Sequence, residues 1–139
     1  IHTVSNGDGM EKTCDLARRD IKGLIFVNLV DFDSKYGHRN DADGYAKALS
    51  SFDSDLKKLD LLLGEGDAAI VTADHGCDPS DVSTDHTREY VPIVAFGRRL
   101  KSGVNLGVRE SFCDIGATVA QLLGLGLKTG KSFAEEIVL

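Results

Sequence analysis

The sequence contains 139 residues, of which 42% are hydrophobic and 27% are charged, and this composition excludes a disordered chain. A formal net charge of −6 disfavours nucleic acid as a partner, because phosphate binding requires clustered Lys and Arg. The apolar runs are too short to span a bilayer, and no basic segment followed by an apolar one marks an N-terminal signal. We therefore expect one cytoplasmic domain that binds neither nucleic acid nor membrane.

The first predicted elements are a helix and a buried strand. Residues 9–20 show a helical pattern, and the Gly-rich stretch SNGDGMEK at 5–12 is interpreted as the turn and N-cap that precede it. The near-continuous apolar run GLIFVNLV at 23–30 is typical of a strand that is buried in a parallel sheet. A helix followed by such a strand indicates an α/β protein.

A longer helix is predicted within residues 40–66. Its apolar side chains recur at alternating steps of four and three residues and form one stripe, made by Tyr45, Leu49, Phe52, Leu56, Leu59 and Leu63. Gly64 is expected to end the helix, because glycine readily adopts the left-handed conformation that closes helices. A single stripe of this kind predicts that one side of the helix packs on the core.

Two further strands and a last helix complete the predicted order. DAAIVTA at 67–73 and VPIVAFG at 91–97 have the apolar character of buried strands. The helix within 111–126 is expected to have Ser111 as its N-cap, and one of its faces carries Ile115, Val119 and Leu122. This order predicts an α/β fold with a mostly parallel sheet flanked by helices, in which functional residues collect at the C-terminal ends of strands.

The three cysteines, Cys14, Cys77 and Cys113, lie at wide spacings that match neither a disulfide framework nor a zinc ribbon. We therefore expect reduced thiols. Cys77 lies beside a histidine-rich loop, but no second cysteine accompanies it, so the sequence disfavours a ligand or nucleophile role.

Polar motifs follow two of the predicted strands. VDFDSKYGHRND follows the strand at 23–30, and a loop that includes TADHG and TDHTREYVP follows the strand at 67–73. The candidate ligands in these motifs are Asp31, Asp33, His38, Asp74, His75, Asp85 and His86. Mixed imidazole and carboxylate ligands suit Zn, Mn, Fe or Co. Because the candidates outnumber the ligands that one ion requires, a two-metal site of the kind used in phosphoryl transfer is indicated.

A structural interpretation of the same residues stays open at this point. Carboxylates such as Asp31, Asp78, Asp81 and Asp85 are individually typical of capping or solvated side chains, and an Asp-His pair in a loop is commonly a cap or a surface ion pair. No P-loop, G-x-S-x-G or G-x-G-x-x-G motif offers a competing function. The residues alone therefore leave a dinuclear metal site and a purely structural loop as alternatives.

The motifs together resemble a known family. VDFDSKYGHRND, TADHG, TDHTREYVP and SFCDIGAT are similar to the C-terminal part of the phosphopentomutases, which belong to the alkaline phosphatase superfamily, and IHTVSNGDGMEKT resembles the segment ahead of them. TADHG is shared with the cofactor-independent phosphoglycerate mutases, whereas the combination of the first and third motifs is more specific. The resemblance covers nearly the whole chain and implies a partial alkaline-phosphatase-like core.

The resemblance also implies a set of metal ligands. One Mn ion would be bound by Asp33, His38 and His86. The second would be bound by Asp74 and His75. The family's spacing selects Asp33 over its neighbour two residues earlier as the ligand.

Four further residues of these motifs receive no chemical assignment from the family. Asp31 is left with a supporting or capping role, while Arg39, Cys77 and Arg88 lie within the matching motifs. Arg88 has two interpretations, a phosphate contact or a pairing with Glu89.

The activity implied by the resemblance is that of an isomerase of nucleoside catabolism. The family interconverts ribose 1-phosphate, or its 2-deoxy form, with the 5-phosphate through a phosphothreonine enzyme, and glucose 1,6-bisphosphate serves as the activator. Its nucleophilic Thr and its sugar-binding cap domain lie in N-terminal parts that residues 1–139 do not contain. We therefore expect this chain to be the C-terminal portion of the metal-binding core, to hold no catalytic nucleophile, to be inactive alone and to require the N-terminal part as its partner.

Two other function classes remain as alternatives. A cofactor-independent phosphoglycerate mutase or related metallophosphatase would share the metal core and differ in substrate, and a noncatalytic metal-binding module would bind metal without transferring phosphate. The first of these is disfavoured by the motif DFDSKYGHRND.

Overall fold

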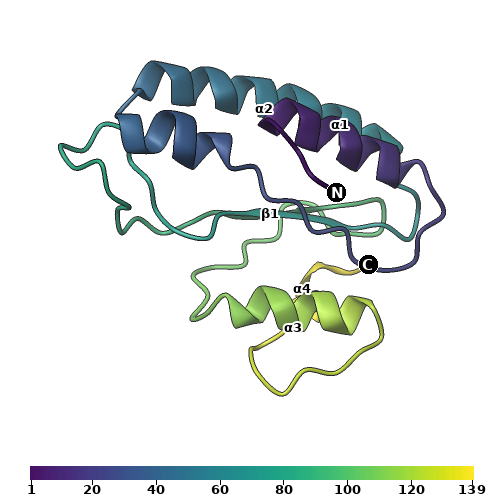
Figure 1. Cartoon of the computed structure of the whole chain (residues 1–139). Coiled ribbons are helices and arrows are strands. Elements are labelled where there is room, and N and C mark those ends of the chain that lie inside the picture. Colours follow the sequence, from purple (N-terminus) through teal and green to yellow (C-terminus); the bar gives the residue numbers. More distant parts are fainter. The chain divides into compact units, whose positions relative to one another are not determined.

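The computed structural model describes residues 1–139 (Figure 1), and the chain divides into two compact units. Unit 1 comprises Ile1–Ile21, Ile25–Leu63 and Ile70–Val94. Unit 2 comprises Lys22–Leu24, Gly64–Ala69 and Ala95–Leu139. No helix is both long enough and apolar enough to pass through a membrane.

Helix α1, Asn6–Ala17, begins unit 1 and confirms the helix expected near the N-terminus. Ser5 is its N-cap, and the Ser5 hydroxyl accepts a hydrogen bond from the backbone N–H of Asp8 at 3.2 Å. Asp8 in turn pairs with Lys12 one helical turn later, at 2.7 Å. The predicted start at residue 9 was too late, because the Gly-rich stretch after Ser5 already forms the first turn of the helix.

Helix α2, Ala42–Leu62, lies alongside α1 (Figure 1), and its predicted apolar stripe is at least half-buried except at Leu49, which is 47% exposed. The Asp41 carboxylate caps its N-terminus by accepting a hydrogen bond from the N–H of Gly44 at 2.9 Å. A buried cluster of Met10, Cys14 and Leu59 joins the two helices, and Phe52, Leu56, Leu62 and Leu63 pack around it. Burial of this shared apolar surface is what stabilises the helix pair.

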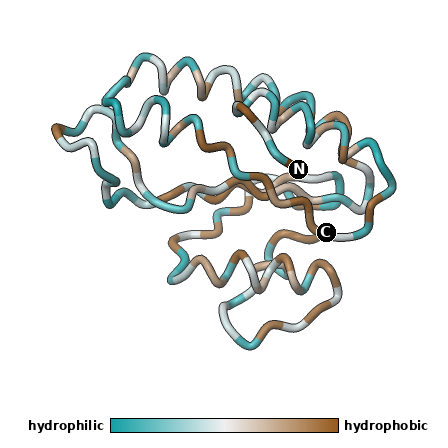
Figure 2. Tube along the Cα trace, viewed as in Figure 1, coloured by the Kyte–Doolittle hydropathy of each residue, from teal (hydrophilic) through white to brown (hydrophobic).

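The run at 23–30 forms no strand, so the predicted parallel strand is wrong. The segment is extended, with alternating half-buried and exposed side chains, and Leu29 packs against Gly9 of α1. Leu24 and Phe26 stay 62% and 84% exposed, although Figure 2 colours this run as strongly hydrophobic. The side-chain period is that of a strand, but no neighbouring strand offers the hydrogen-bonding partners that a ladder requires.

The sheet consists of β1, Ala69–Thr72, and β2, Ile93–Phe96, which pair in antiparallel fashion. Both strands fall within their predicted ranges, and the α/β class is confirmed. The mostly parallel sheet is not found, because the connection from β1 to β2 is a loop that returns the chain in the opposite direction and contains no crossover helix.

Unit 2 contains α3, Cys113–Leu122, and the short α4, Ala134–Ile137. The predicted apolar face of α3 is half-buried at Ile115 and Val119 and exposed at Leu122, whereas the fully buried side chains are Asp114, Ala117, Thr118 and Ala120. The fully buried Phe133 lies on this side and donates its backbone N–H to the Thr118 hydroxyl at 2.9 Å. Small side chains on α3 leave space for that ring. Ser111 lies one residue before the N-cap position, Phe112, and its hydroxyl accepts from the N–H of Cys113.

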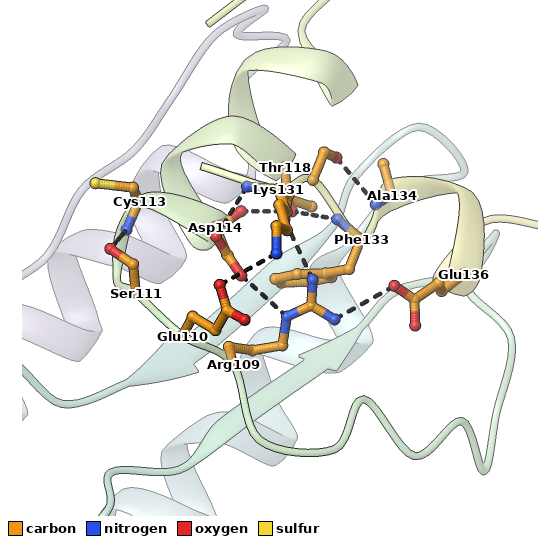
Figure 3. A network of polar contacts seen from close by, with 11 residues as sticks. Arg109, Glu110, Ser111, Cys113, Asp114, Thr118, Lys131, Phe133, Ala134 and Glu136 are labelled. Atoms are coloured by element: carbon orange, nitrogen blue, oxygen red, sulfur yellow. Dashed lines mark hydrogen bonds and ion pairs between the residues drawn. The ribbon is translucent and has the colours of Figure 1, made fainter. Parts of the chain in front are cut away.

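A network of polar contacts surrounds the buried Asp114 in unit 2 (Figure 3). One carboxylate oxygen accepts from the backbone N–H of Lys131 at 2.8 Å, and the other accepts from the Arg109 guanidinium at 3.2 Å. Arg109 also lies over the Phe133 ring, 5.4 Å from its centroid. The Lys131 amide above all, together with Arg109, holds the pKa of Asp114 below its usual value against the opposing effect of burial.

Candidate metal centre

Two candidate ligands lie on consecutive short helical turns of unit 1. Asp33 is on η1, a π-helical turn at Phe32–Tyr36, and His38 is on η2, a 3-10 turn at Gly37–Arg39. Asn40 ends the second turn in the left-handed conformation, with φ of 50°. This tight sequence of turns brings the Asp33 carboxylate and the His38 ring to the same side of the chain, with Asp33 Oδ1 3.3 Å from His38 Nε2.

The other candidate ligands lie in the loop that follows β1. Asp74 and His75 come directly after the strand, and the loop then folds back through an antiparallel bridge between Gly76 and Thr87. The N–H of Thr87 donates to the Gly76 carbonyl at 3.1 Å. This bridge brings His86 over His75, and the two imidazole rings stack with centroids 3.6 Å apart.

Three imidazole nitrogens converge on one carboxylate oxygen, Asp33 Oδ1. The Nε2 atoms of His38, His86 and His75 lie 3.3, 3.2 and 3.9 Å from it. The oxygen is buried and has no hydrogen-bond partner. Asp74 completes the group, with its Oδ1 3.5 Å from His75 Nε2. The five residues implied by the family resemblance are therefore neighbours in space.

The tautomers of two of these rings follow from their other contacts. His38 Nδ1 lies against the Thr84 carbonyl, and His75 Nδ1 lies 3.0 Å from the Gly76 carbonyl. A carbonyl can only accept a hydrogen bond, so Nδ1 carries the proton when the ring is neutral, and the Nε2 lone pair points toward Asp33. Histidine ligands of metals commonly have this arrangement, in which the second ring nitrogen is held by a carbonyl.

The arrangement fits a divalent cation. Lone pairs on several Nε2 atoms and on a carboxylate oxygen repel one another unless a positive charge lies between them. Asp33, His75 and His86 each offer one such atom, all within 4.8 Å of one another. Imidazole and carboxylate ligands in this mixture suit Mn, Zn or Fe.

Cys77 contributes to the centre by packing. Its sulfur presses on the backbone of Gly37, where the structure leaves no room for a Cβ atom. Burial raises the pKa of the Cys77 thiol, and the negative charges of Asp33, Glu89 and Asp78 raise it further, so the thiol stays protonated. This contact joins the loop after β1 to the turn that carries His38. Sequence reasoning missed it, because Gly37 and Cys77 are far apart in the chain.

The remaining carboxylates and arginines of the motifs lie outside this group. Asp78 accepts hydrogen bonds from Ser80, and Asp81 accepts one from the N–H of Ser83, so capping is confirmed for both carboxylates. The hydrogen bonds from the Ser80 hydroxyl and from the Ser80 backbone N–H also hold the pKa of Asp78 below its usual value. Asp85, Arg39 and Arg88 are exposed, and Asp31 is buried near α1.

Comparison with known proteins places the chain in a family. The chain belongs to the Metalloenzyme superfamily, whose family model matches residues 2–127. Its sequence is 53% identical over 138 residues to a phosphopentomutase of Clostridioides difficile (strain 630), and this match covers 99% of the chain. The phosphopentomutases of Clostridium novyi (strain NT) and Carboxydothermus hydrogenoformans (strain ATCC BAA-161 / DSM 6008 / Z-2901) are 50% and 53% identical over 99% and 97% of the chain.

These relatives are longer proteins, since the chain spans 35% to 36% of the lengths of the three. The resemblance to phosphopentomutases that the motifs indicate is therefore confirmed, over a portion of the relatives' length.

Proposed function

We propose that the protein is a phosphopentomutase, an isomerase that interconverts ribose 1-phosphate or 2-deoxyribose 1-phosphate with the corresponding 5-phosphate. The observation that carries the proposal is the convergence of three imidazoles on the unpaired Asp33 oxygen, in a chain about half identical to enzymes of that name. In this proposal residues 1–139 supply part of the metal site of a cytoplasmic enzyme. Sugar phosphate is then the substrate class.

We assign the ligands to two Mn ions. Asp33, His38 and His86 would hold one ion, because the two nearest Nε2 atoms belong to these histidines. Asp74 and His75 would hold the other, and their contact at 3.5 Å supports a shared site. The two proposed sites would be adjacent, since His75 Nε2 lies 3.9 Å from Asp33 Oδ1.

In such a centre the chain's own residues act by placing ligand atoms. The Thr84 and Gly76 carbonyls hold the tautomers in which Nε2 of His38 and His75 is free to bind a cation. Bound divalent ions would neutralise the charge of the transferring phosphoryl group and lower the pKa of an attacking hydroxyl. Because the rings are already positioned, little reorganisation is required when charge develops.

The nucleophile is assigned to the rest of the protein. Thr87 donates its hydroxyl to Glu89 and accepts from the N–H of Asp78, and Thr84 serves through its backbone carbonyl. The Thr87 hydroxyl is therefore already engaged within its own loop. We propose that a phosphothreonine and the sugar-binding part come from residues outside this chain, that glucose 1,6-bisphosphate primes the enzyme, and that the chain alone does not turn over.

The test is an assay of the intact protein with Mn2+ and glucose 1,6-bisphosphate, run in parallel on ribose 1-phosphate and on phosphoglycerate. Formation of ribose 5-phosphate, abolished by chelation of the metal, is the expected result. Turnover of phosphoglycerate alone would assign the protein to the mutases of that substrate. Metal binding without turnover of either compound would make it a noncatalytic relative.

A further inference from the structure

We infer that Asn6 is a positioning residue for the metal centre, acting through Asp31. The two residues form a reciprocal pair of hydrogen bonds, named here the Asn6–Asp31 clamp. The clamp fixes the start of the turn that carries Asp33. This inference rests on the proposed metal centre and adds a residue that makes no contact with the proposed ligands.

The clamp joins two segments that are distant in the sequence. The backbone N–H of Asn6 donates to Asp31 Oδ2 at 2.9 Å, and the backbone N–H of Asp31 donates to Asn6 Oδ1 at 3.0 Å, across 25 positions of the chain. Asp31 is only 8% exposed, and its other oxygen pairs with Lys35 at 3.0 Å. Because each residue uses its backbone and its side chain, neither can rotate without breaking a hydrogen bond that is shielded from water.

The clamp lies next to the turn that carries Asp33 and restrains the position of its carboxylate. Asp31 is the N-cap residue of η1, yet its side chain makes no capping hydrogen bond to that turn and binds the first N–H of α1 instead. Only Phe32 separates Asp31 from Asp33, and the Phe32 ring packs on Tyr45 and Phe52 of α2. The turn is thus held by α1 on one side and by α2 on the other, which leaves the Asp33 carboxylate little freedom to leave the histidines.

Stability alone does not explain the amide of Asn6. Its Nδ2 is buried without a hydrogen-bond partner, and Asn6 and Asp31 both line a cavity of about 150 Å³ next to Tyr36 and Phe52. A buried donor without a partner is destabilising, and a residue without that donor would avoid the penalty. The Oδ1 of the same amide, which holds the N–H of Asp31, is the feature that offsets it.

The test measures Mn2+ binding to the intact protein that carries this chain, by the electron paramagnetic resonance signal of free Mn2+, together with thermal melting. Asn6→Ala is expected to raise the dissociation constant of one Mn ion about tenfold, the lower end of the effect seen when groups that orient metal ligands are removed. Asp31→Ala should do the same. Asp31→Asn keeps an oxygen that can accept from the Asn6 N–H, so it should bind Mn2+ with an affinity within about threefold of the unsubstituted protein.

Asp8→Ala is the matched control. It removes the hydrogen bonds that Asp8 accepts from Val4 and Lys12 in the same first turn of α1, and it leaves the clamp untouched. This variant should melt at a lower temperature with its Mn2+ affinity unchanged. Equal losses of Mn2+ affinity in Asp8→Ala and Asn6→Ala would show that the clamp is a purely structural contact, and this result would overturn the inference.

The remaining outcomes separate the inference from the proposed function. Unchanged Mn2+ affinity in Asn6→Ala, with the unsubstituted protein binding Mn2+, would overturn the clamp and leave the metal centre intact. Failure of the unsubstituted protein to bind Mn2+ would overturn the metal centre, and the clamp with it. If Asn6→Ala does not fold, the comparison of Asp31→Asn with Asp31→Ala decides, since only a positioning role predicts rescue by the amide.

Discussion

Asp114 and Asp33 have carboxylate groups with opposite surroundings. In unit 2 both oxygens of Asp114 accept hydrogen bonds, one from the Lys131 N–H and one from Arg109. In unit 1 the buried Oδ1 of Asp33 accepts none and faces the Nε2 atoms of three histidines. We interpret this as the difference between a carboxylate that stabilises the fold and one that is available to bind a cation, because unpaired buried polar atoms are rare unless function retains them.

The largest expected effect comes from Asp33→Ala in the intact protein. Loss of this proposed metal ligand should lower phosphopentomutase turnover by at least about a hundredfold, since removal of groups that only orient metal ligands already costs about ten- to a hundredfold. Its melting temperature without metal should stay the same or rise, since the removed Oδ1 makes no hydrogen bond. Steady-state assays and melting curves of the metal-free protein check both parts; a large loss of metal-free stability would make Asp33 a structural residue.

Asp114→Ala should show the reverse pattern. The substitution leaves Arg109 and the Lys131 N–H without their shared partner, so the melting temperature should fall clearly. Mn2+ affinity should be unchanged in the folded fraction. Thermal melting and Mn2+ titration in the same preparation provide the measurement, and a variant that kept its stability but lost Mn2+ would reverse the comparison between the two carboxylates.

Gly37→Ala tests the packing beside the centre. An added methyl group would meet the Cys77 sulfur, and relief of that overlap should destabilise the protein by about 1–3 kcal/mol and displace the adjacent His38. The double variant Gly37→Ala/Cys77→Ala should recover most of the loss, because the sulfur is removed. Urea unfolding of the single and double variants measures this. Additive losses in the double variant would show that the contact does not couple the two loops.

The smallest expected effect is the dependence of stability on pH that arises from Asp114 in unit 2. Because the pKa of Asp114 is lowered in the folded state, its ionised form contributes stability that is present above the ordinary Asp pKa of about 3.9 and is lost as the pH falls through the lowered value. Asp114→Asn should lack this component, so the stability difference between the two proteins should shrink below about pH 4. Melting curves at stepwise lower pH measure it, and a constant difference would contradict the assignment.

The sequence predicts elements well where a pattern is local. The stripe on α2, the strands at β1 and β2 and the grouping of histidines with carboxylates after β1 all depend on residues close in the chain. Composition and hydrophobic periodicity could not predict which segments pair with one another in space. The run at 23–30 has the apolar character of a strand, but strand formation also requires a neighbour, and that information lies outside the run.

The difference between the predicted apolar side of α3 and its most buried side has a similar cause. Periodicity marks Ile115, Val119 and Leu122 as the apolar side, whereas the structure buries smaller side chains where Phe133 fills the space. Contacts such as Asn6 with Asp31, or Gly37 with Cys77, join residues from different elements and leave no periodic signal. The family motifs therefore predicted which residues form the candidate site, whereas the groups that hold those residues in place were not predictable.

The most direct test of the central claim is the Mn content of the intact protein after gel filtration, measured for the unsubstituted protein and for His86→Ala and Asp74→Ala. The proposal predicts two bound ions in the unsubstituted protein and the loss of one ion in each variant, because the two residues are assigned to different ions. Retention of both ions in both variants, or absence of metal from the unsubstituted protein, would contradict the account.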